Sequence, residues 1–130
     1  MRVIIAGSRG FNDYKYLSSK IDDYIKKNPS NTLEIISGTA VGADTLGSIY
    51  AEEHHIHLTE MPAQWEYYGR AAGILRNCDM VKYASASREK GVLLAFWDGK
   101  SVGTKHVIEE ANRRGLEVKV FNYNSIGTKA

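Results

Sequence analysis

The sequence predicts an α/β protein with a doubly wound parallel sheet of about five strands and helices on both faces. Apolar, β-branched runs alternate with stretches of helical periodicity along the chain. The first two runs begin about thirty residues apart, which is the length of one β-α-β unit. Residues 91–97 are apolar throughout, as expected of a central strand that is buried on both faces.

Each expected element follows from its local pattern. Residues 2–6 are the first expected strand, and Asn12 or Asp13 can cap a helix over 14–27 that ends before Pro29. Residues 64–70 are rich in aromatic side chains and are expected to be irregular. The other expected strands cover 33–36, 56–61, 91–97 and 117–121, and the other expected helices cover 45–53, 71–84 and 103–114.

These elements are expected to form one domain over residues 1–121, followed by a polar, frayed tail over 122–130. The single cysteine, Cys78, excludes an internal disulfide and fits a cytoplasmic protein. No run approaches the roughly 18 apolar residues of a membrane span, so no membrane partner is expected. The net charge of +2 comes without a strong basic patch, which disfavours nucleic acid as a partner.

Three glycine-containing loops each follow an expected strand, at residues 7–10, 38–42 and 99–103. In a parallel sheet every strand-to-helix loop lies at the same carboxyl edge. The three loops should therefore converge on one site, where glycines permit close approach and helix N-termini offer N–H groups. This convergence predicts an anionic, nucleotide-like small molecule as the ligand.

The loop at residues 37–44 is open to two interpretations. It follows a β-branched run and leads into a helix, which suits a phosphate cradle in which Asp44 accepts from a sugar hydroxyl. It also suits a tight strand-to-helix connection with Asp44 as the helix cap.

Two common nucleotide motifs do not fit the chain. Residues 99–101 resemble the end of a P-loop, but the first glycine of that motif would fall on Leu94, so an ATPase or kinase is not expected. Residues 7–10 lack the G-x-G-x-x-G spacing of dinucleotide dehydrogenases. No cofactor is predicted.

The histidine and cysteine residues form no recognisable metal motif. His54, His55 and His57 are expected at the sheet edge opposite the glycine loops, without a carboxylate or cysteine to complete a site. Cys78 is expected to be a packed side chain, since no histidine is its obvious partner. His106 is either a weak acid–base candidate near the ligand or a solvated helix residue.

Aromatic and arginine side chains near the loops leave alternatives open. Trp65, Tyr67 and Tyr68 could stack on a base or could cover the core. Arg9 and Arg76 could pair with phosphate or could be solvated surface side chains.

Four blocks of the sequence resemble a known family. They are residues 3–11 (VIIAGSRGF), 37–44 (SGTAVGAD), Pro62, Trp65 and Gly69 with 72–77 (AGILRN), and 95–104 (AFWDGKSVGT). In these blocks the chain is similar to the YspA-like, cpYpsA-related branch of the SLOG superfamily, named for the Smf/DprA and Lonely Guy proteins. The resemblance implies a Rossmann-like fold that binds nucleotides or nucleotide-derived ligands. Relatives in the superfamily commonly pair through helices, which implies a homodimer.

The resemblance carries over unevenly. Gly38, Gly42, Gly103 and Thr104 fall on the superfamily's ligand loops, and Arg76 and Asn77 fall on the Arg-Asn pair of this branch. Val41 stands where the branch often has an arginine, and Val107 stands where Lonely Guy enzymes carry a catalytic glutamate. A phosphoribohydrolase needs a carboxylate near its oxocarbenium-like centre, so Val107 argues against that activity.

Three functions follow, in decreasing order of support. The first is a sensor that binds a nucleotide or a nucleotide-derived, for example NAD-derived, signal. The second is a hydrolase that cleaves an N-glycosidic or phosphoester bond, with Asp98 or Asp44 as the catalytic carboxylate. The third is single-stranded DNA binding, against which low net charge and Val41 argue. The expected ligand-binding residues are Gly7, Ser8, Arg9, Gly38, Thr39, Gly42, Asp44, Arg76, Asn77, Gly99, Ser101, Gly103 and Thr104.

Overall fold

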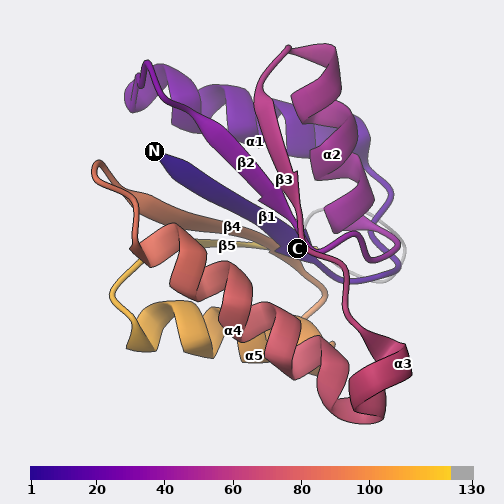
Figure 1. The fold of residues 1–130 in the computed structure, drawn as a ribbon. Coiled ribbons are helices and arrows are strands. Elements are labelled where there is room, and N and C mark those ends of the chain that lie inside the picture. The colour runs from indigo at the N-terminus through magenta and orange to yellow at the C-terminus, as the bar shows by residue number, and fades with distance from the viewer. Residues whose placement is uncertain (124–130) are drawn as a thin grey trace.

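The structure is a computed structural model that describes residues 1–123, and its centre is a five-stranded parallel sheet (Figure 1). The strand order is β3-β2-β1-β4-β5, and every pair of neighbours is parallel. This arrangement confirms the predicted α/β, Rossmann-like fold class. The strands are β1 (Arg2–Gly7), β2 (Glu34–Ser37), β3 (His57–Glu60), β4 (Gly91–Trp97) and β5 (Glu117–Asn122).

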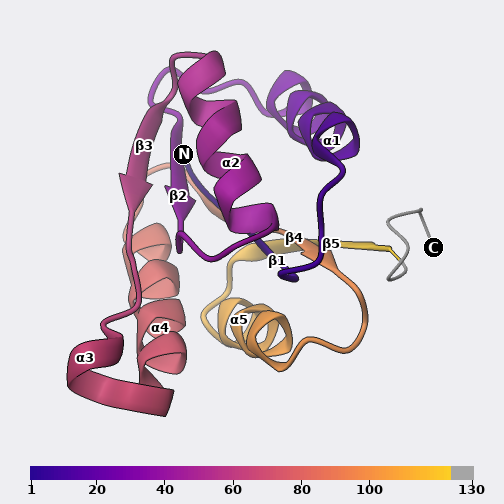
Figure 2. The same ribbon diagram turned by 90° about the vertical axis from the view of Figure 1, so that its right-hand side faces the viewer.

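Helices cover both faces of the sheet, and Figure 2 shows α1 and α2 on one face and α4 and α5 on the other. Helix α3 is a single turn that continues through a 3-10 turn, η1, into α4. The bounds are α1 (Tyr14–Lys27), α2 (Ala43–Glu53), α3 (Trp65–Tyr68), η1 (Gly69–Ala71), α4 (Ala72–Ser85) and α5 (Val102–Arg113).

The strand pleat divides the core into two halves. Because successive side chains of a strand point to opposite faces, Val3 and Ile5 of β1 pack with α1 and α2. Ile4 and Ala6, the alternate residues, pack with α4 and α5. Residues 92–96 of β4 are buried, as predicted for a central strand. The sheet is therefore a rigid base for the loops at its carboxyl edge.

The structure differs from the sequence-based expectation at two places. Within 64–70, expected to be irregular, residues 65–70 form α3 and the first part of η1. Asn122 is the last residue of β5, and the buried Tyr123 ring lies 4.9 Å from the Phe11 ring, centroid to centroid, so the ordered chain runs past the expected start of the tail. The rest of the expected tail, 124–130, lies outside the described residues. Among residues 1–123, no helix is long and apolar enough to cross a membrane.

The strand order reverses between β1 and β4. The chain places β2 and β3 on one side of β1, and then crosses through α3 and α4 to place β4 on the other side. Open α/β sheets bind ligands in the crevice that such a reversal leaves at the carboxyl ends of the strands. The candidate site lies at this point.

Candidate functional site

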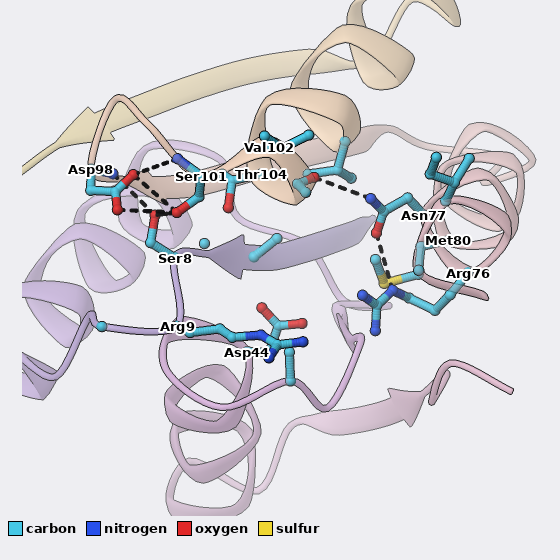
Figure 3. A pocket seen from close by; sticks show the side chains of 18 of the residues that line it. Ser8, Arg9, Asp44, Arg76, Asn77, Met80, Asp98, Ser101, Val102 and Thr104 are labelled. Carbon is cyan, nitrogen blue, oxygen red and sulfur yellow. Dashed lines mark hydrogen bonds between the residues drawn. The ribbon is translucent and has the colours of Figure 1, made fainter. Parts of the chain in front are cut away.

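A cavity of about 590 Å³ opens at the carboxyl ends of β1 and β4. Its walls come from the loop after β1, the loop after β2, the start of α5 and one face of α4. Figure 3 shows Ser8, Asp98 and Ser101 at one end, Arg76 and Asn77 at the other, and Arg9 and Asp44 between them. A volume of this size suits a small-molecule ligand.

Most of the predicted site residues line this cavity. They are Gly7, Ser8, Arg9, Asp44, Arg76, Asn77, Asp98, Ser101, Gly103 and Thr104. Gly38, Thr39, Gly42 and Gly99 are absent from its lining. Of the three glycine loops, the first and the third therefore supply most of the wall, while the second contributes Ala40 and Asp44.

The glycines of the second loop serve packing. Gly42 has a φ of +96°, and a Cβ there would lie 2.8 Å from the Arg9 Cα and closer still to the Ser8 carbonyl oxygen. The absence of a side chain therefore lets the loop after β2 lie directly against the loop after β1. The Gly38 carbonyl accepts a hydrogen bond of 2.6 Å from Arg76 Nη1. The close approach at Gly42 fits the tight-connection interpretation, whereas Gly38 contacts Arg76 of the cavity wall.

Hydrogen bonds hold the loop between β4 and α5 in one shape. The Asp98 carboxylate accepts from the N–H groups of Lys100 and Ser101, both at 2.8 Å, and from the Ser101 hydroxyl at 3.0 Å. The Ser101 and Ser8 hydroxyl oxygens are hydrogen-bonded to each other at 2.9 Å. Trp97 Nε1 donates to the Ser101 carbonyl at 3.0 Å. The third loop is thus tied to β4 and to the first loop, and the protein's own hydrogen bonds set its conformation.

These contacts define the chemical state of Asp98. Its partial burial raises its pKa, but the hydrogen bonds from Ser101 and Lys100 outweigh that effect, and the pKa lies below its ordinary value. Asp98 is therefore an ionised acceptor whose oxygens are engaged by its own loop. As a catalytic acid it would have to give up these bonds.

The N-terminus of α5 faces the cavity with its N–H groups available. The first N–H groups of a helix have no partner within the helix. Asp13 caps α1 in the usual way, since its carboxylate accepts from the Tyr16 N–H at 3.0 Å. For α5, no side chain among residues 1–123 caps the N-terminus, and Val102 and Gly103 are exposed at the cavity. This end of α5 can bind an anion.

Three arginines, Arg9, Arg70 and Arg76, line the same cavity. Burial lowers the pKa of Arg76; the charge of Asp44 opposes this, and the positive charge of Arg9 lowers the pKa further. Arg9 and Arg76 thus bring two positive charges to the same cavity, beside the carboxyl group of Asp44. Guanidinium groups of this kind are suited to phosphate.

Asp44 lies in the first turn of α2 and is only 4% exposed. Burial raises its pKa to about 6, although the guanidinium of Arg76 and the N–H groups of Ala40 and Gly7 favour the charged form. The residue that precedes α2 as its cap is Gly42, so Asp44 is not the helix cap. It is a buried carboxyl group at the cavity wall that titrates near neutral pH.

The raised pKa of Asp44 predicts a pH-dependent stability. The folded protein holds this proton more tightly than the unfolded chain, whose ordinary value is 3.8. Protonation of Asp44 therefore stabilises the folded state. This stabilisation is fully present below pH 3.8 and is lost as the pH rises through about 6, and it amounts to about 3 kcal/mol. The free energy of unfolding is measured with urea for the wild type and for Asp44→Asn at pH 4 and pH 7. Relative to the variant, the wild type should lose about 2–3 kcal/mol of stability between the two pH values. A constant difference would contradict the assignment.

Asn77 connects α4 to α5. Its Nδ2 donates to the Gly103 carbonyl at 3.2 Å and lies 3.1 Å from His106 Nδ1, while its Oδ1 accepts from Arg76 Nε at 3.0 Å. Its side chain is thus engaged in positioning Arg76 and the first turns of α5. His106 does not line the cavity, and its contact with Asn77 places it behind the wall.

One face of α4 forms a wall that the sequence analysis did not identify as a whole. Gly73, Arg76, Asn77 and Met80 line the cavity at the spacing i, i+3, i+4, i+7. This spacing places four residues on one face of a helix, so the signal was present in the sequence. Arg70 and Ile74 also line the cavity and share this spacing, since Gly73, Ile74 and Asn77 follow Arg70 at i+3, i+4 and i+7.

The apolar part of the wall includes Val107, which is 2% exposed. The position of the Lonely Guy glutamate is thus an apolar patch. Glu110, one turn further along α5, pairs with Arg113 and Arg114 and does not line the cavity. Among residues 1–123, the carboxyl groups in the cavity lining are those of Asp44 and Asp98.

Cys78, expected to have no histidine partner, lies near His106. The Cys78 sulfur, a ring nitrogen of His106 and a carboxylate oxygen of Glu110 lie within 4.8 Å of one another, between α4 and α5. The two oxygens of Glu110 are already paired with Arg113 and Arg114. A cation at this cluster would compete with an arginine for an oxygen of Glu110.

Comparisons with known proteins agree with the geometry. The model of the YspA, cpYpsA-related SLOG family matches residues 1–68. A protein of Mycobacterium phage D29, named "Gene 61 protein", is 34% identical over 125 residues, which cover 92% of this chain and 95% of the phage protein. No solved structure matches the chain.

Proposed function

Since the chain belongs to the YspA, cpYpsA-related SLOG family, we propose that it binds a nucleotide or a nucleotide-derived ligand in the cavity between β1 and β4. The observation that carries the proposal is the first turn of α5, whose N–H groups face a cavity that Arg9 and Arg76 also line. Helix N-termini and guanidinium groups both bind phosphate well, through N–H donors and positive charge.

The shape of the site also suits a nucleotide. The phosphate end would lie at Gly103 and Thr104, and the apolar surface of Val107 and Met80 would lie beneath the ligand. Asp44 would accept a hydrogen bond from a ribose hydroxyl when ionised. Ser8 and Ser101 would act indirectly, because their hydroxyls bond each other and hold the loops together.

Binding and turnover are measured together on the purified protein. Calorimetric titration with AMP, UMP, NAD and a cyclic nucleotide should give saturable binding of at least one compound, with the compound recovered intact by chromatography. Absence of binding by every compound would contradict the proposal. Native mass spectrometry of the protein as purified would identify a ligand retained from the cell.

A nucleotide N-glycosidic hydrolase is the second candidate, and the buried carboxyl of Asp44 favours it. A carboxyl group with a pKa of about 6 is suited to general acid–base catalysis near neutral pH. In this case free base or ribose phosphate would appear during the incubation, and Asp44→Asn would abolish release while it retains binding. Single-stranded DNA binding and a homodimer stay predictions.

A further inference from the structure

We propose that the indole of Trp65 is the platform on which the base of the ligand stacks. This inference rests on the proposed function, since it names the base-binding end of the same cavity. Trp65 begins α3 and is 52% exposed, yet it lines the cavity that the first turn of α5 also lines. An aromatic ring with an exposed surface at the wall of a nucleotide-sized cavity can stack on any base.

Gly73 of α4 lies beside the indole. The Trp65 Cη2 atom lies 3.4 Å from the place that a Cβ would take at Gly73. This is an ordinary van der Waals distance, so one edge of the ring lies beside the first turn of α4. Gly73 and Trp65 thus form adjoining parts of the cavity wall.

The apolar rim of the cavity indicates that an apolar group covers it in the bound state. Ile74 and Val102 are 52% and 81% exposed, and both line the same cavity as Trp65. The cavity thus combines exposed apolar side chains with the anion-binding turn of α5. A molecule with a flat aromatic base and a phosphate matches both parts.

The neighbouring tyrosines are not equivalent to Trp65. Tyr67 and Tyr68 are 82% and 53% exposed, but neither lines this cavity. Tyr68 lies at a separate cavity beside Met61 and Pro62. The structure therefore selects one of the three aromatic residues, and Tyr67 is a matched control on the same short helix.

The test compares ligands with and without a base. AMP and ribose 5-phosphate are titrated calorimetrically into the wild type, Trp65→Ala, Trp65→Phe and Tyr67→Ala. For the wild type we expect tighter binding of AMP than of ribose 5-phosphate. Trp65→Ala should weaken AMP binding at least five-fold and leave ribose 5-phosphate binding unchanged. Trp65→Phe should retain most of the affinity for AMP, and Tyr67→Ala should behave as the wild type.

Three outcomes overturn the proposal. If Trp65→Ala lowered the affinities for AMP and for ribose 5-phosphate equally, the indole would only support the structure of α3. Unchanged AMP binding would mean that the base lies elsewhere, while the proposed function stands. If neither ligand binds the wild type but another nucleotide of the panel does, that nucleotide replaces AMP in the comparison. If no nucleotide binds the wild type, the proposed function is wrong and the proposed platform is wrong with it. Thermal melting of each variant shows that the fold is retained.

Discussion

Replacing Gly103 by aspartate is expected to abolish tight phosphate binding without destabilising the protein. Gly103 is the second residue of α5, and apart from its chain neighbours and the adjacent backbone of α5, no atom among residues 1–123 lies within 4 Å of a Cβ built there. The new carboxylate would therefore fit beside the N-terminal N–H groups of α5. It would take the place of the ligand anion and repel it, and AMP affinity should fall at least ten-fold, or about 1.4 kcal/mol.

The same substitution should leave stability equal or slightly higher. A negative charge in the first turn of a helix is favourable by about 0.3–1 kcal/mol, and glycine is a poor helix former. Gly103→Asn is the matched control, because it has nearly the same shape without the charge. If Gly103→Asp and Gly103→Asn bind AMP equally well, the anion does not lie at this turn.

Replacing Gly42 by alanine is expected to destabilise the protein by about 2–4 kcal/mol. Gly42 has a φ of +96°, a backbone conformation that residues with a side chain rarely adopt. The new Cβ would also lie 2.8 Å from the Arg9 Cα. The loops after β1 and β2 would have to separate. Equilibrium urea unfolding measures the loss directly.

Gly10→Ala provides the control for this prediction. Gly10 also lines the cavity, but a Cβ there would have its nearest neighbour, Tyr123 Oη, at 4.0 Å. The free energy of unfolding of Gly10→Ala should stay within about 0.5 kcal/mol of the wild-type value. Equal stability of Gly42→Ala and Gly10→Ala would show that the close approach of the two loops is not required.

The architecture could be predicted from the sequence because the local signals agree with the global fold. The bounds of α1 match the expected 14–27, since Asp13 caps one end and the chain turns before Pro29 at the other. The ends of strands were predicted less accurately, because they depend on pairing with neighbouring strands. Gly7 extends β1 beyond the expected 2–6 because it pairs with Phe96 of β4. The expected convergence of the loops follows from the geometry of any parallel sheet.

The roles of individual glycines could not be predicted. Gly42 and Gly103 look equivalent in sequence, yet one lies against the neighbouring loop and the other faces open space. That difference depends on how closely two loops approach in three dimensions. The contribution of α4 was missed although its lining residues already share one helix face in the sequence; which face turns to the cavity depends on the packing of Val81 and Ala84 against the sheet.

The central claim is that the phosphate of a nucleotide binds at the first turn of α5. Titration of ¹⁵N-labelled protein with AMP, followed by amide NMR spectra, tests it most directly. We expect the largest shifts at residues 102–104, followed by those at Arg9 and Gly10. Saturable binding that leaves residues 102–104 unshifted and instead moves the amides beside Met61 and Asp79, at the second cavity, would contradict the claim.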